Sequence, residues 1–98
     1  MVRLTEEEIK AIKETAFEVF GNNVSVWLFG SRVNPELKGG DIDLYIELDE
    51  MKNWFEKKLE FLVKLKEKIG EQKIDVIVKP SGCKEFISIE AKTKGIKL

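Results

Sequence analysis

The run DIDLYIEL at residues 41–48 alternates strictly between polar and apolar side chains, and this pattern constrains the fold more than any other feature of the chain. Successive side chains of a strand point to opposite faces of a sheet. One face of the run is therefore aliphatic, through Ile42, Leu44, Ile46 and Leu48, and the other carries Asp41, Asp43, Tyr45 and Glu47. The pattern predicts a strand whose aspartates face away from the core, with Glu47 as a rim charge and Tyr45 packed beside the aspartates.

Further helices and strands are predicted on both sides of this run. Thr5 followed by three glutamates is typical of a helix start, and the helix is expected to end before Gly21. The expected helices cover residues 6–20, about 51–69 and 85–93, and the expected strands cover 24–29, 41–48 and 73–79. We therefore expect a single domain over residues 1–98 with an α/β (α+β) fold, in which a small mixed β-sheet has helices packed on one face.

Composition excludes several classes of function. The chain has 17 basic and 18 acidic residues, so no global positive field favours general nucleic-acid binding. It contains no histidine, which removes histidine-based catalysis and most zinc sites. The single cysteine, Cys83, has no partner for an internal disulfide, and the sequence shows neither a signal peptide nor a long apolar run. We expect a cytoplasmic protein whose chemistry depends on carboxylates, hydroxyls, lysine, arginine and oxygen-bound metals.

The two aspartates of the alternating run are candidates for metal binding. Asp41 and Asp43 are two residues apart on one strand face, so their like charges repel unless a cation lies between them. Mg²⁺ prefers carboxylates together with substrate phosphates. Asp75 points away from its apolar neighbours and would join the cluster if its strand lay beside residues 41–48. Three such carboxylates can hold two metal ions for in-line phosphoryl displacement.

The segment Gly30-Ser31-Arg32 precedes the aspartates and suits phosphate binding. Gly30 has no Cβ atom and allows close backbone approach, Ser31 offers a hydroxyl, and Arg32 could pair with a phosphate. Each feature alone has a plainer explanation, since a Gly-Ser turn is most often an ordinary loop and an Asp-x-Asp pair is most often exposed to solvent. Their common order along the chain favours a shared site.

Together, FGSR, DIDLYIEL and IDVIV resemble the minimal nucleotidyltransferase domains of the DNA polymerase β superfamily over nearly the whole chain. The resemblance implies a polymerase β-like nucleotidyltransferase fold and the transfer of a nucleoside monophosphate from an NTP such as ATP to a hydroxyl. It implies that Gly30 and Ser31 hold the nucleotide phosphates. It also implies that Asp41, Asp43 and Asp75 bind two Mg²⁺ ions, with Asp75 as the base. Gly40 departs from the family, in which many members have serine before the first aspartate.

Free-standing domains of this size resemble the antitoxin of two-gene modules whose partner is an all-helical HEPN toxin. The resemblance implies transfer of AMP to a tyrosine of that partner. Two alternatives remain open: an antitoxin that neutralises its partner by contact alone, and a nucleotidyltransferase acting on a small molecule or RNA. The last would need an acceptor pocket that 98 residues do not readily supply.

Two pairs of apolar residues allow more than one interpretation. Phe61 and Val63 lie beside the apolar stripe of the second expected helix, either as edges of the core or as a docking surface for the partner. Trp27 and Phe29 share one strand face, where core packing is favoured over a role in a base pocket.

Overall fold

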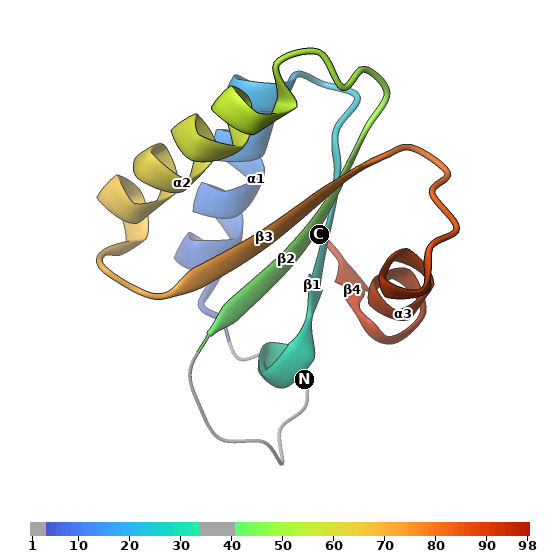
Figure 1. Cartoon of the computed structure of the whole chain (residues 1–98). Helices are drawn as coiled ribbons and strands as arrows, with labels where there is room; N and C mark the ends of the chain where they lie inside the picture. Colours follow the sequence, from blue (N-terminus) through green and yellow to red (C-terminus); the bar gives the residue numbers. More distant parts are fainter. Residues whose placement is uncertain (1–3, 34–40) are drawn as a thin grey trace.

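The computed structural model describes residues 4–33 and 41–98, and side chains in that range except those of Ser31 and Arg32. Four strands form one mixed sheet in the order β3-β2-β1-β4 (Figure 1). Strands β2 (Ile42–Leu48) and β3 (Ile74–Pro80) are parallel, whereas β1 (Ser25–Phe29) pairs antiparallel with β2 and with β4 (Ile96–Lys97). The α+β fold with a small mixed sheet is confirmed.

Helix α1 (Glu6–Phe20) begins where the sequence predicts. The Thr5 hydroxyl accepts a hydrogen bond from the Glu8 backbone N–H at 3.1 Å, and the Glu8 carboxylate accepts one from the Thr5 N–H at 3.0 Å. This reciprocal capping satisfies two of the free N–H groups at the helix start. Gly21, with φ of 97°, follows the last turn.

Helix α2 (Trp54–Ile69) begins three residues later than expected. Asn53 has a left-handed backbone with φ of 57°, and the Trp54 N–H donates to the Met51 carbonyl, so residues 51–53 form a turn. Asp49, which could have capped an earlier start, accepts a hydrogen bond from the Ser81 hydroxyl instead. The helix connects the parallel strands β2 and β3, as such a crossover requires.

Helices α1 and α2 pack side by side on one face of the sheet (Figure 1). The aliphatic sides of β1, β2 and β3 face them and form the core, together with residues such as Ile12, Ala16 and Leu65. The Phe20 and Phe61 rings join the two helices, with centroids 5.6 Å apart. Within the described segments, no helix is long and apolar enough to cross a membrane.

Helix α3 (Phe86–Lys94) corrects the expectation that all helices lie on one face. It lies on the opposite face of the sheet from α1 and α2 (Figure 1), where its Lys92 pairs with Glu47. The polar side of β2 therefore differs along its length: Tyr45 and Glu47 are buried, whereas Asp43 is only half-buried. That difference positions the candidate site.

Candidate functional site

The structure brings Asp41, Asp43 and Asp75 to one end of the sheet. Asp43 is in β2, and its register partner in the parallel strand β3 is Asp75. Paired residues of neighbouring strands share a face of the sheet, and the strands lie about 4.8 Å apart. Asp41 lies two residues before Asp43 and thus on the same side. The sequence predicted this cluster only on the condition that the two strands are neighbours, and they are.

Gly30 lies against the Asp43 side chain, at the end of the neighbouring strand β1. It follows β1, whose last residue, Phe29, is the register partner of Asp43, and it has φ of +77°. A Cβ atom at Gly30 would lie 3.1 Å from Cγ of Asp43 and still closer to its carboxylate oxygen Oδ2. Only glycine combines this backbone angle with this close approach. Residues Gly30–Val33 form a short 3-10 helix, η1.

The charges of the cluster are only partly balanced. Burial raises the pKa of Asp43, and the nearby carboxylates of Asp75 and Asp41 raise it further, while Lys73 acts in the opposite direction. Like charges held close together make a carboxylate easier to protonate, because protonation relieves their repulsion. A bound cation would offset the same repulsion. The cluster thus has the electrostatic character of a cation site.

Lys73 is a member of the site that the sequence analysis missed. Its ammonium Nζ lies 3.3 Å from Oδ2 of Asp41, and its backbone carbonyl accepts a hydrogen bond from the Ile42 N–H. Asp41 raises the pKa of Lys73 through this contact, and the charges of Asp75 and Asp43 add to the effect. The signal was present in the sequence, because Lys73 precedes Asp75 by two residues and therefore shares its face.

The donor set fits Mg²⁺ or a similar hard cation. Asp41, Asp43 and Asp75 offer only carboxylate oxygens, which is the ligand type that Mg²⁺ prefers. Among the described residues, no three acidic, histidine or cysteine side chains converge closely enough to form a complete metal cage. A cation would therefore have to draw these side chains together. The predicted phosphate-binding side chains of Ser31 and Arg32 lie outside the described part of the structure.

Glu47 is not the rim charge that its position suggested. It is only 6% exposed, accepts a hydrogen bond from the Tyr45 hydroxyl at 2.6 Å, and pairs with Lys92 Nζ at 2.7 Å. The Gly82 N–H donates to its other carboxylate oxygen at 3.4 Å, and Lys92 also donates to the Cys83 carbonyl. The sequence pattern placed Glu47 on the correct face, but it could not show that α3 would cover it.

The aromatic residues beside the cluster pack against one another. Tyr45 is fully buried, as expected for a packing role. Its ring lies 5.7 Å from that of Trp27, and Lys97 Nζ lies 5.4 Å from the Trp27 ring. Phe29 is half-buried on the same face. These contacts give Trp27 a structural role that needs no nucleotide base.

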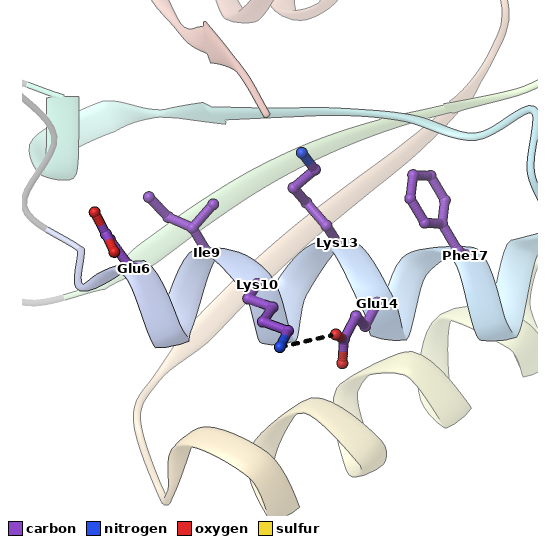
Figure 2. A pocket seen from close by; sticks show the side chains of 6 residues that line it. All are labelled: Glu6, Ile9, Lys10, Lys13, Glu14 and Phe17. Atoms are coloured by element: carbon purple, nitrogen blue, oxygen red, sulfur yellow. Dashed lines mark ion pairs between the residues drawn. The ribbon is translucent and has the colours of Figure 1, made fainter.

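A groove of about 350 Å³ runs along α1 (Figure 2). Every residue that lines it comes from α1. Two of its charged residues, Lys10 and Glu14, pair with each other. The groove is lined by Glu6, Ile9, Lys10, Lys13, Glu14 and Phe17. It contains no residue of the aspartate cluster, so it is a separate surface feature.

Comparison with known families agrees with the chemistry of the cluster. The family described as nucleotidyltransferase domain matches residues 7–98, a range that includes Gly30, all three aspartates and α3. A comparison with curated proteins gave no match. The match extends over nearly the entire chain and over every strand of the sheet. The chain belongs to the nucleotidyltransferase domain family.

Proposed function

We propose that this chain transfers AMP from ATP to a hydroxyl group of a partner protein, with two Mg²⁺ ions held by Asp41, Asp43 and Asp75. The observation that supports this most strongly is the position of Asp43. It is the register partner of Asp75 in the neighbouring parallel strand, and it contacts Gly30, where an added Cβ atom would lie 3.1 Å from Asp43 Cγ. The family match supports nucleotidyl transfer in general. ATP, Mg²⁺ and the partner belong to the proposal.

The proposed reaction is a displacement at the α-phosphorus of ATP. The acceptor oxygen forms a bond to that phosphorus, the bond to the bridging oxygen breaks, and pyrophosphate leaves. Bound Mg²⁺ ions would stabilise the charge on the attacking and leaving oxygens. Asp75 is exposed on its strand, where it can accept the proton from the acceptor hydroxyl. Gly30 and Ser31 are assigned to the nucleotide phosphates by family resemblance, and Arg32 is a candidate phosphate partner because of its positive charge.

The proposed acceptor is a tyrosine on an all-helical HEPN toxin, and the chain would be its antitoxin. An exposed apolar line on α2 supports a docked partner, although it differs from the pair predicted from sequence. Phe61 is fully buried against the Phe20 ring, whereas Val63 is 59% exposed. Phe55, Leu59 and Val63 lie four residues apart and are all exposed, so they form one line along the helix, here called the α2 line.

The test is transfer of label from ATP carrying ³²P at the α-phosphate to a co-purified HEPN partner. We expect Mg²⁺-dependent labelling of a partner tyrosine, reduced by at least about 100-fold in Asp43→Asn, as typically follows loss of a charged group that acts on the reacting phosphate. The matched control is Glu14→Gln, which removes one negative charge from α1. Full labelling by Asp43→Asn would overturn the proposed mechanism.

A second candidate function is neutralisation by contact alone. The α2 line supports it, because a partner docked there would not depend on the aspartates. Asp43→Asn separates the two functions when it is co-expressed with the toxin. Loss of protection supports the transferase, and full protection without labelling supports the contact-only antitoxin.

A further inference from the structure

Lys73 provides the positive charge that the structure places directly against the aspartate cluster. Its Nζ is 3.3 Å from Asp41 Oδ2. Lys73 directly precedes β3 and Asp41 directly precedes β2, at the end where Ile42 pairs with Ile74. It therefore lies opposite Asp41 as a cross-strand pair of opposite charges. Its charge also acts on Asp43, where it partly offsets the repulsion from the two other carboxylates.

The ion pair between Lys73 and Asp41 costs little free energy to break. The Lys73 side chain is 72% exposed and that of Asp41 is 39% exposed. Exposed ion pairs contribute little to stability, because water solvates both charges when they separate. The long, flexible lysine side chain can move its charge by several ångströms without any change in the backbone. A divalent ion binds carboxylates more strongly than an ammonium group does, so it can displace Lys73 from Asp41.

We propose that Lys73 is an exchangeable counter-cation and nucleotide-binding residue of this site. Without a metal ion, its ammonium group neutralises Asp41. When the cation binds, Lys73 is released and turns to the polyphosphate of the nucleotide, which the same metal ions hold. This inference rests on the proposed function, because it requires metal and nucleotide to bind at the aspartates. It adds a residue that the resemblance to the family did not assign.

The proposal predicts opposite changes in two affinities when Lys73 loses its charge. In Lys73→Gln, Mn²⁺ without nucleotide should bind about threefold more tightly, because its competitor for Asp41 is gone. ATP at saturating Mn²⁺ should bind about tenfold more weakly, because a charge-assisted contact to phosphate is lost. The concentration of free Mn²⁺ is measured by electron paramagnetic resonance, and ATP binding is measured by calorimetry.

Lys10→Gln is the matched control. Lys10 also pairs with a carboxylate, at 3.8 Å from Glu14, and its side chain is 76% exposed, but it lies on α1. Both affinities should equal those of the wild type in this variant. Lys73→Arg keeps the charge and should remain within about twofold of the wild type. Lys73→Met is a second neutral variant that keeps the aliphatic stem.

The outcomes separate this inference from the proposed function. Opposite changes in both neutral variants of Lys73 support the exchange. If either affinity is unchanged, or if both change in the same direction, the exchange is wrong while metal and nucleotide binding stand. If the wild type binds neither Mn²⁺ nor ATP, the proposed function and the inference both fail.

Discussion

At the scale of single residues, the ionised Asp43 side chain destabilises the empty fold. Burial and the neighbouring Asp75 and Asp41 raise its pKa, so its ionised form is disfavoured in the folded protein relative to the unfolded chain. Such a site is unfavourable for the empty fold and favourable for a cation. The arrangement is typical of a functional site, at which a protein tolerates local repulsion.

We therefore predict that Asp43→Asn raises the melting temperature of the metal-free protein at neutral pH. The sign follows from linkage: a raised carboxyl pKa destabilises the fold at high pH, and the effect disappears once both states are protonated. The difference in melting temperature between variant and wild type should disappear as the pH falls towards 3.8, the ordinary pKa of an aspartate. Thermal unfolding over a pH series measures it. Equal melting temperatures at every pH would contradict the prediction.

Gly30→Ala tests the close approach to Asp43. Gly21→Ala is its control, because Gly21 also has a positive φ, of 97°, but an added Cβ atom would meet nothing within 4 Å. Both variants lose about 1 kcal/mol to backbone strain. Gly30→Ala should lose about 1–2 kcal/mol more through the clash with the carboxylate. Denaturant unfolding of the two variants gives the difference, and equal losses would show that the carboxylate moves away freely.

At the scale of secondary-structure elements, local patterns predicted most of the fold. The alternation at residues 41–48 gave β2 to within a residue, and the Thr5 capping signal gave the start of α1. Three features escaped prediction because they depend on tertiary contacts. Strand β4 is two residues long and forms only against β1. Helix α2 begins after a turn at residues 51–53, with Asp49 bonded to Ser81, and α3 covers the second face through Glu47.

Glu47→Gln tests how α3 is held on the sheet. Burial raises the pKa of Glu47, but the hydrogen bonds from Lys92, Tyr45 and the Gly82 N–H outweigh it, so the net pKa is lowered. The stabilisation is thus present above pH 4.5, the ordinary value, and is lost as the pH falls through the lowered one. We expect the free energy of unfolding of the variant to fall by about 1–3 kcal/mol near pH 7.

The control for this prediction is Glu90→Gln, because Glu90 lies on α3 itself but does not contact the sheet through Glu47. Glu90 pairs with Lys94, whose side chain is 74% exposed, so the loss should stay below about 0.5 kcal/mol. Urea unfolding at pH 7 and at pH 4 should show the Glu47→Gln deficit shrinking at the lower pH. A deficit that is equal at both values would mean that the charge of Glu47 does not hold α3.

At the scale of the whole molecule, the sheet separates two different surfaces. One face and its end carry the aspartates and α3, and the other carries α1 and α2 with the exposed α2 line (Figure 1). The sequence predicted the three aspartates and Gly30 from their order along the chain. It missed Lys73, although this lysine shares a face with Asp75 in the sequence pattern, because only the parallel pairing of β2 and β3 places it beside Asp41.

The α2 line makes a prediction about the partner. Leu59→Gln should weaken binding to the proposed HEPN partner by at least about tenfold, since an apolar contact at the centre of an interface typically contributes more than 1 kcal/mol. Its effect on folding should stay within about 0.5 kcal/mol, because the side chain is exposed. Lys68→Gln, on the other side of the helix, is the control. Unchanged partner binding by Leu59→Gln would exclude the α2 line as the docking surface.

The central claim is that the aspartate cluster binds metal and nucleotide together. Calorimetric titration of ATP into the purified protein, with Mg²⁺ and with EDTA, tests it most directly, alongside Asp41→Asn, Asp43→Asn and the control Glu14→Gln. We predict ATP binding that requires Mg²⁺, is lost in both aspartate variants and is unchanged in the control. ATP binding that is equal in EDTA, or that survives in Asp43→Asn, would contradict the account.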